Sequence, residues 1–464
     1  MNRSPEQAGR PGGPAANPLG TEPVGSLLLK FAAPTIVSTL IGSLYNIVDQ
    51  IFIGQKIGFL GNAATTVAYP LTILSGALTL LISNGSAVNF NVLNGRGKQD
   101  DALSFAGNGL SLLTVEGILL ALAVGIFAPW FANLCGATKQ VFPYALTYIR
   151  IIAFGMPFLT LTSGGTLLIR SDGSPRYALV CSMAGVVVNF ILDWLFLFPL
   201  NMGIGGAALA TVLGQVCSAL MVLRYMRGFK TGRLLPAHFR VSPERFREIA
   251  SLGAAASLNQ AAMLVMNLVL NSSLRHYGEL SVYGGSEALA AAGVVTKVNF
   301  LFYSTIIGCS IGGAPIMGFN YGAGQFGRVK ETYFKVLRYA LAVGALETAC
   351  FWLFPHQILQ LFGSGVGGYE DFALRYMHVF MLLVILAGLP PISMNAMSSV
   401  KKPKKGIMIS LSKQLALIVL LLALPHAFGI DGVLYAGPVA DLLAALCSAL
   451  VITREFRKLG AQPL

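Results

Sequence analysis

The sequence predicts an all-α polytopic membrane protein with 12 transmembrane helices in two six-helix lobes, on three observations. First, 55% of its 464 residues are hydrophobic and only 11% are charged, with a mean hydropathy of +0.69. A soluble surface needs far more charge than this. Second, the apolar residues fall into runs of about 20 or more, enough for a helix to cross a hydrocarbon core about 30 Å thick. Third, the chain contains a repeat about half its length.

The repeat is clearest in two glycine-rich stretches, 85–97 and 312–324, which match at a constant offset of 312 − 85 = 227. The matching small residues are Gly85 with Gly312, Ala87 with Ala314, Gly95 with Gly322, and Gly97 with Gly324. Ser171 and Pro175 recur as Ser399 and Pro403, at an offset of 228. A repeat of this length predicts two homologous lobes. Six spans in each half give both lobes one orientation, so we expect a pseudo-two-fold axis along the membrane normal.

The predicted spans follow in order along the chain. In the first half they run near 27–53, 64–90, 103–129, 144–169, 177–198 and 207–224. In the second half they run near 249–274, 288–317, 336–355, 373–398, 407–427 and 433–453. Each must be a helix, because lipid offers backbone groups no partners and the short alternating segments of a barrel are missing from the pattern. Prolines inside or at the ends of these spans predict bends at Pro34, Pro70, Pro157, Pro315, Pro390 and Pro391.

The loops predict the domains and the orientation. We expect lobes at 25–227 and 248–455, a cytoplasmic inter-lobe loop at 228–247, and tails at 1–24 (disordered) and 456–464. Lysine and arginine gather in every second loop, which places those loops and both termini in the cytoplasm, with the chain in the plasma (inner) membrane. The net charge of +13 is thereby explained without a nucleic-acid partner. The scattered cysteines and histidines lack metal-ligand spacing, so we expect no metal, no cofactor and no enzymatic activity.

Five carboxylates lie inside predicted spans: Asp49, Glu116, Asp193, Glu347 and Asp441. A carboxylate at membrane depth costs about 2.5–3.5 kcal/mol, so it usually faces a cavity or a partner. Asn189 and Asp193 are four residues apart and share a helix face. Together with Asp49 they suit a hard cation or a shared proton. The alternative is structural: Asp49 caps a helix end and Asp193 pairs with a buried cation.

These residues resemble a known family, the multidrug and toxic compound extrusion (MATE) transporters. The resemblance covers 25–455 and rests on Pro34, the stretch 45–54 (YNIVDQIFIG), the two glycine-rich stretches and the loop 170–175 (RSDGSP). It is strongest to the bacterial, DinF-like branch. It implies a monomeric secondary antiporter in the lipid bilayer, which exports drugs and other cationic or amphipathic compounds in exchange for H⁺ or Na⁺. Transport would proceed by alternating access between the two lobes.

The resemblance also implies roles for particular residues. An ion-coupling site would consist of Asp49, Asn189, Asp193 and Thr211, and Pro34 would take part in the conformational change. We expect coupling in the first lobe, because the seventh and tenth spans lack the acids that other branches place there. Whether H⁺ or Na⁺ is the coupling ion stays open.

A substrate cavity is predicted from Met, aromatic and polar residues, which suit adaptable binding of flat cations. The candidates are Tyr45, Phe154, Met156, Phe158, Met183, Asn259, Gln260, Met263, Lys297, Tyr303 and Met394. Lys297 fits either a coupling role or an ion pair. For Glu116 and Glu347 we favour a stabilising role, and we expect Asp441 to pair with Lys413.

Two rival functions remain. A flippase of lipid-linked oligosaccharides would need a strongly cationic cavity, for which only Arg150, Lys297 and Lys413 are candidates. A membrane receptor or enzyme would need a soluble domain or a catalytic constellation, and neither is visible in the sequence.

Overall fold

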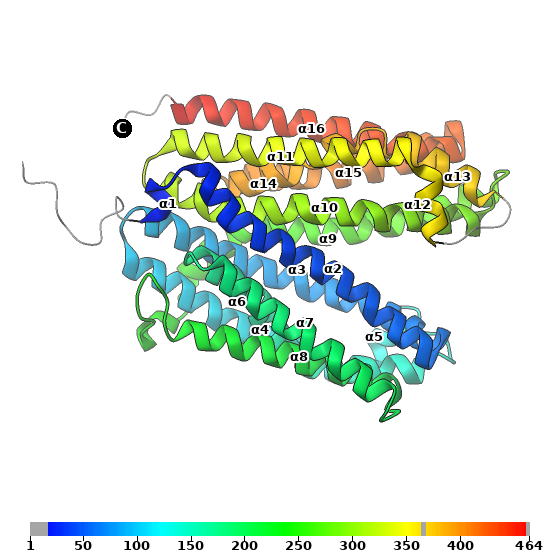
Figure 1. The fold of residues 1–464 in the computed structure, drawn as a ribbon, viewed down its shortest axis with the longest axis horizontal. Coiled ribbons are helices and arrows are strands. Elements are labelled where there is room, and N and C mark those ends of the chain that lie inside the picture. Colours follow the sequence, from blue (N-terminus) through cyan, green and yellow to red (C-terminus); the bar gives the residue numbers. More distant parts are fainter. Residues whose placement is uncertain (1–16, 363–367, 461–464) are drawn as a thin grey trace, which may run out of the picture.

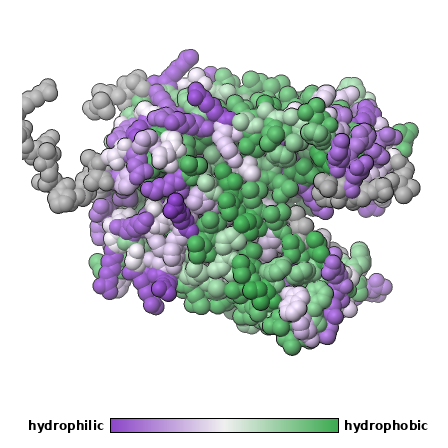
Figure 2. All heavy atoms as spheres, in the orientation of Figure 1, coloured by the Kyte–Doolittle hydropathy of each residue, from purple (hydrophilic) through white to green (hydrophobic). Residues whose placement is uncertain are grey.

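A computed structural model describes residues 17–362 and 368–460 of the chain, and this described part consists of helices and connecting turns. The helices form two bundles that lie side by side (Figure 1), with α2 running obliquely along both. Eleven helices of the described part are long and apolar enough to cross a membrane, and one bent helix pair supplies a twelfth span. Apolar side chains form a broad band between polar ends (Figure 2), as a membrane requires.

The helices lie over the predicted spans. The first bundle, the N-lobe, consists of α2 (Val24–Ile57), α3 (Phe59–Gly95), α4 (Gln99–Ile126), α6 (Phe142–Ser171), α7 (Pro175–Leu197) and α8 (Gly203–Met226). The second, the C-lobe, consists of α9 (Pro243–Glu279), α10 (Gly285–Gly322), α11 (Phe326–Leu353), α15 (Pro403–Phe428) and α16 (Ile430–Gly460), plus the bent pair. Two short helices, α5 (Ala128–Leu134) and α12 (Pro355–Phe362), follow α4 and α11.

The tenth span is broken, although the sequence predicts one helix over 373–398. It consists of α13 (Tyr369–Arg375), a π-helical turn (Tyr376–Phe380), a 3₁₀ turn (Val384–Leu386) and α14 (Leu389–Ser399), with a bend of 50°. Pro390 and Pro391 explain the break, because they occupy the first turn of α14, where a missing N–H costs nothing. The double proline therefore starts a new helix instead of bending a continuous one.

Three predicted boundaries also differ from the structure. The expected N-terminal tail lies outside the described residues up to residue 16, but Pro18–Thr21 form a short helix, α1. Arg328 on α11 donates hydrogen bonds to the carbonyls of Leu19 (3.1 Å) and Glu22 (2.6 Å), so this segment is fastened to the C-lobe. The inter-lobe loop is shorter than 228–247, because α9 begins at Pro243. The C-terminal tail is shorter too, because α16 continues to Gly460.

The pseudo-two-fold symmetry is visible in the helix boundaries. Helix α4 (99–126) maps onto α11 (326–353) by the offset 227 at both ends, and α5 begins 227 residues before α12. At the inter-lobe contact, a Cβ added to Gly95 would overlap the Phe319 carbonyl, and one added to Gly322 would overlap the Val92 carbonyl. Since 92 + 227 = 319 and 95 + 227 = 322, each contact is the symmetry copy of the other. The axis therefore passes between the ends of α3 and α10.

The lobes touch near the end of the molecule where α1 and the C-terminal part of α16 lie (Figure 1). There α2 packs closely on α10, with Ala32 against Gly312 and Ile36 against Gly308. Helix α3 packs on α9 in the same way, around Gly85 and Gly253. At the opposite end the two bundles part, and a notch separates them (right side of Figure 2). The protein is thus closed at the end of its termini and open at the other.

Candidate functional site

The predicted acid pair is assembled inside the N-lobe, where α2 packs on α7. The rings of Phe52 and Phe190 join these two helices, with centroids 5.3 Å apart. One turn from this contact, Asp49 on α2 and Asp193 on α7 lie within hydrogen-bonding reach of each other. Both are buried, with 9% of Asp49 and 1% of Asp193 exposed.

An amide and several hydroxyl groups complete this cluster. Asn189, one turn before Asp193, donates to the Thr211 hydroxyl on α8 at 3.3 Å. Thr211 in turn donates to the carbonyl of Ala207 at 3.1 Å. Tyr45, one turn before Asp49 on α2, contacts Thr211. The structure therefore brings together the four residues predicted for ion coupling, and it adds Tyr45, which was expected in the substrate cavity.

Tyr148 on α6 is a member of the cluster that sequence reasoning missed. It lies close enough to Asp49 and Asp193 to feel the charge of both carboxylates. Nothing in the sequence distinguishes it from a packing tyrosine such as Tyr144 in the same span. Its role becomes visible only when α6 is placed beside α2 and α7.

The cluster contains acids without a basic partner. None of the ion pairs within 4.0 Å among the described residues involves Asp49 or Asp193. Oxygen atoms of Asp49, Asn189 and Asp193 are buried there without a hydrogen-bond donor from the described chain. Asp49 is not at a helix end either, since α2 continues to Ile57. Two adjoining carboxylates in such a place can share a proton or hold a small hard cation with oxygen ligands.

Helix α2 links this cluster to the contact between the lobes. Pro34 lies within α2, two residues after Ala32, which packs against Gly312 of the C-lobe. The proline removes one helical hydrogen bond and so weakens the helix there. Asp49 follows 15 residues later, about 22 Å along the helix at 1.5 Å per residue. A change of position or shape in α2 therefore acts at both places.

The predicted substrate cavity is not assembled in the N-lobe. Met156 is 1% exposed and packs in a core cluster to which each of the helices α2 to α8 contributes. Phe154 is 78% exposed, but it lies six residues after Tyr148, about 240° around α6, and points away from the cluster. Phe158 packs half-buried against another core cluster. Met183 is half-buried and lies seven residues before Phe190, on the same face of α7.

The predicted C-lobe residues are also dispersed. Met394 is buried in a core cluster. Asn259 accepts a hydrogen bond from Gln414 at 2.7 Å within the lobe. Met263 is half-buried, and so is Gln260, which lies seven residues after Gly253 on the α9 face that contacts α3.

Lys297 is exposed and lies on the α10 face that contacts α2. It shares this face with Ser304, whose carbonyl accepts a hydrogen bond from Thr39 of α2 at 2.9 Å. The face is buried at Ser304 and Gly308 and exposed at Lys297, toward the open end. Lys297 therefore faces the space between the parted lobes.

The remaining intramembrane acids have partners within each lobe. Glu116 accepts a hydrogen bond from Thr79 at 3.0 Å in the N-lobe. Glu347 accepts one from Asn299 at 2.8 Å in the C-lobe. The predicted pair of Lys413 and Asp441 is present at 2.6 Å. Tyr303, expected in the substrate cavity, instead lies beside this pair.

The symmetry copy of the acid cluster is apolar. Ala32 and Ile249 are equivalent in the two lobes, an offset of 217, so Met266 takes the place of Asp49 (49 + 217 = 266). With the offset 228 between Pro175 and Pro403, Leu417 and Leu421 replace Asn189 and Asp193. Both leucines are buried in a core cluster against which Met266 packs. The two lobes share a backbone, but only the N-lobe has this polar site.

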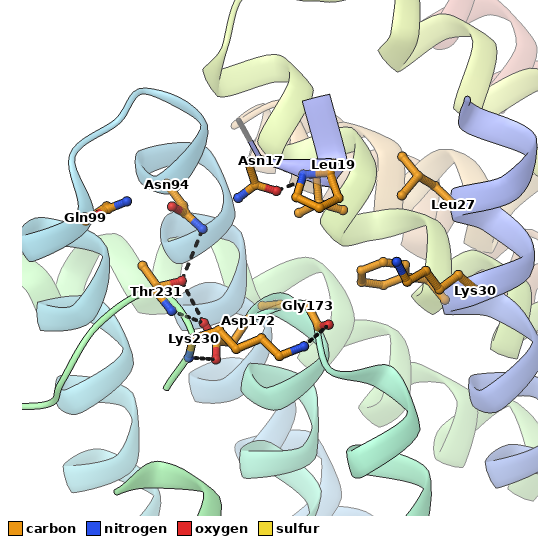
Figure 3. A pocket seen from close by; sticks show the side chains of 13 residues that line it. Asn17, Leu19, Leu27, Lys30, Asn94, Gln99, Asp172, Gly173, Lys230 and Thr231 are labelled. Atoms are coloured by element: carbon orange, nitrogen blue, oxygen red, sulfur yellow. Dashed lines mark hydrogen bonds between the residues drawn. The ribbon is translucent and has the colours of Figure 1, made fainter. Parts of the chain in front are cut away.

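A second polar feature lies at the closed end of the protein, near α1. A cavity of about 310 Å³ lies there between α1, the start of α2, and the loops of the N-lobe (Figure 3). Asp172 beside it accepts hydrogen bonds from the backbone of Lys230 (2.6 Å) and Thr231 (2.9 Å) and from two hydroxyls, those of Thr231 (2.6 Å) and Tyr225 (2.8 Å). Burial raises the pKa of Asp172, and these bonds oppose the rise. Asp172 thus anchors the inter-lobe loop to the N-lobe.

Comparison with known proteins decides the family. The MatE family model matches residues 34–195 and 255–423, one segment in each lobe and together more than half of the chain. The chain belongs to the MatE family. This MATE transporter is 25% identical over 445 residues to the multidrug export protein MepA of Staphylococcus aureus (strain NCTC 8325 / PS 47), covering 93% of this chain and 94% of MepA. It is also 25% identical over 435 residues to a FAD transporter of Shewanella oneidensis, covering 91% and 93%.

A solved structure shares the fold of this MATE transporter. It shows the outward-facing conformation of a multidrug resistance MATE family transporter of the MOP superfamily. The TM-score is 0.87 at 19% identity, over 95% of this chain and 97% of that chain. The two-lobe fold expected from the sequence is thereby confirmed.

Proposed function

We propose that this MATE transporter is a multidrug efflux antiporter, which exports amphipathic organic compounds in exchange for H⁺ or Na⁺. The observation that carries the proposal is the buried pair Asp49 and Asp193, which has no basic partner among the described residues. A buried carboxylate pair without a counter-charge needs a proton or a cation. The name of the relative MepA supports multidrug export as the activity.

In the proposed cycle the protein lies in the cell membrane, the open cleft faces the outside and both termini face the cytoplasm. Binding of the coupling ion at Asp49 and Asp193 pulls α2 and α7 together. Helix α2, weakened at Pro34, transmits the change to the inter-lobe contact at Ala32. Ion and drug must prefer different states, because a ligand with equal affinity for both states shifts neither. The protein would act as a monomer, since each chain contains both lobes.

Export of an anionic compound is a second candidate, favoured by one observation. Lys297 is exposed toward the space between the lobes and forms no ion pair within 4.0 Å among the described residues. The name of the FAD transporter relative agrees with an anionic substrate. A lipid-linked oligosaccharide flippase is not favoured. Of its candidate cations, Lys413 is paired with Asp441, and Arg150 lies about 200° around α6 from Tyr148, away from the lobe interior.

The experiment is ethidium efflux from vesicles containing the purified protein. A pH gradient and a Na⁺ gradient are imposed separately, and the expected result is that one of them drives efflux. Asp49→Asn and Asp193→Asn should each abolish the gradient-driven efflux while the protein remains folded. Efflux that responds to neither gradient, or that persists in both variants, would refute the proposal.

A further inference from the structure

The C-lobe buries its own group of charges, on four different helices. Asp441 on α16 pairs with Lys413 on α15 at 2.6 Å, and Tyr303 on α10 adjoins the pair. Glu347 on α11 is 1% exposed and feels the charges of both Lys413 and Asp441. These four are the titratable groups that act on one another here in the described structure. Asn299, a neutral amide, is the hydrogen-bond donor to Glu347.

The charges of this group do not balance. Two carboxylates share the single ammonium group of Lys413, and the 2.6 Å contact assigns it to Asp441. An unpaired carboxylate at membrane depth costs about 2.5–3.5 kcal/mol. Glu347 therefore requires a further positive charge in this conformation. A proton fits better than Na⁺, because a single O–H bond neutralises the carboxylate, whereas a hard metal ion needs several oxygen ligands.

The fold does not require the Lys413–Asp441 pair. The equivalent positions in the N-lobe are Gly185 (185 + 228 = 413) and Gly214 (214 + 227 = 441), where α7 and α8 cross. A Cβ on Gly214 would lie 2.7 Å from the Gly185 carbonyl, so this crossing is close and uncharged. The same pair of helices thus packs with two glycines in one lobe and with an ion pair in the other. Since buried ion pairs contribute little to stability, packing alone does not explain the C-lobe pair.

Glu116 shows what a buried glutamate does without this ion pair. It lies on the equivalent helix, about one turn from the position that matches Glu347 (347 − 227 = 120), and its partner is the neutral hydroxyl of Thr79. No ammonium or guanidinium of the described chain lies within 4.0 Å of it. Glu116 thus has a hydrogen-bond donor but no cation beside its carboxylate. Glu347, beside Lys413, has a cation toward which a carboxylate can turn.

We propose that Glu347, Lys413 and Asp441 form a second proton-binding site, in the C-lobe, which binds and releases one proton in each transport cycle. When Glu347 is protonated, Lys413 remains with Asp441 as in this structure. When Glu347 loses its proton, its carboxylate shares the Lys413 ammonium with Asp441, which draws α11 toward α15 and α16. The side chain of Lys413 is 28% exposed, which gives the released proton a route out of the lobe. This inference rests on the proposed antiport.

The test counts protons released when ethidium binds to the purified protein in a weakly buffered detergent solution containing a pH indicator. Glu347→Gln should release one proton fewer per bound ethidium than the unaltered protein. Glu116→Gln, the matched control at the buried glutamate of the equivalent helix, should release the same number as the unaltered protein. The double variant Lys413→Met/Asp441→Asn should also release one proton fewer, because Glu347 then has no cation to stabilise its carboxylate and keeps its proton. This variant covers the case in which Glu347→Gln fails to fold.

Infrared titration of the same proteins gives a readout that does not depend on ethidium. Raising the pH should remove one more carboxylic-acid group from the spectrum in the unaltered protein and in Glu116→Gln than in Glu347→Gln, where the acids of the N-lobe titrate as before. Unchanged proton release together with an unchanged titration in Glu347→Gln and the double variant would overturn the C-lobe site. If Asp49→Asn releases one proton fewer per bound ethidium and these variants do not, the proposed antiport is supported and the C-lobe site is refuted. If these variants release one proton fewer and Asp49→Asn does not, the C-lobe site is supported and the N-lobe site is refuted.

Discussion

The glycines between the lobes should control which end of the transporter is closed. Gly312 on α10 packs against α2, and a Cβ at this position would lie 2.6 Å from the Cα of Ala32. Ordinary van der Waals contact begins at 3.4 Å, so Gly312→Ala requires the two backbones to separate by 3.4 − 2.6 = 0.8 Å. Overpacking of this kind costs about 1–3 kcal/mol. Because the cost falls on the state in which the lobes touch, a value near 2 kcal/mol reduces that state's population about 30-fold.

The assay measures how readily the closed end opens. Ser171, which lines the cavity there and is buried, is replaced by cysteine in a chain whose native cysteines are changed to serine or alanine. Maleimide labelling of this cysteine should accelerate in Gly312→Ala, and efflux should fall. Gly293→Ala is the control, because Gly293 is on the same helix and a Cβ there meets no atom within 4 Å. Equal labelling rates for the two alanine variants would refute the reasoning.

Two further predictions concern the anchor of the inter-lobe loop and the N-lobe core. Asp172→Asn replaces one acceptor oxygen by an NH₂ donor opposite the N–H donors of Lys230 and Thr231. The free energy of unfolding should fall by about 2–4 kcal/mol. The change is measured as a lower unfolding temperature and as faster tryptic cleavage after Lys230. The conservative change Asp101→Asn, at an exposed position, should do neither. Met156→Ala should destabilise the protein by about 2–5 kcal/mol, while the set of exported compounds stays the same. A changed set of exported compounds would show that Met156 contributes to substrate binding.

Most of the backbone could be predicted from the sequence, because span length and hydropathy are local properties of the chain. The break in the tenth span was harder to foresee. Pro390 and Pro391 were visible, but a proline in a span either bends a helix or begins a new one. Which of these occurs depends on the packing of the preceding turn. The π turn Tyr376–Phe380 stacks the rings of Tyr376 and Phe380 at 4.5 Å, and no local pattern predicts that.

The candidate site was predictable only in part, for a different reason. Asp49 and Asp193 are recognisable because acids are expensive in lipid. The placement of Met156 in a core and of Phe154 on an exposed face could not be predicted, because Met and Phe are equally suited to a core, a cavity or the lipid face and the sequence does not orient α6. The C-lobe group of Lys413, Asp441 and Glu347 is spread over three helices that meet only in the folded lobe. The comparison with Gly185 and Gly214 was also out of reach, because these glycines align with Lys413 and Asp441 only when α7 and α15 are matched at an offset of 228 and α8 and α16 at an offset of 227.

The reciprocal contact of Gly95 with Phe319 and of Gly322 with Val92 has a consequence for how the chain came to be built. In a symmetric dimer of identical subunits, residue i of one subunit meets residue j of the other, and j meets i. The contact here has that isologous form, with positions 92 and 95 of each half facing each other across the axis. A six-helix half-chain with a matching sequence therefore presents a self-complementary surface. Because both halves are in one chain, either half can change without the other, and the two lobes accordingly bury different charges around a shared contact.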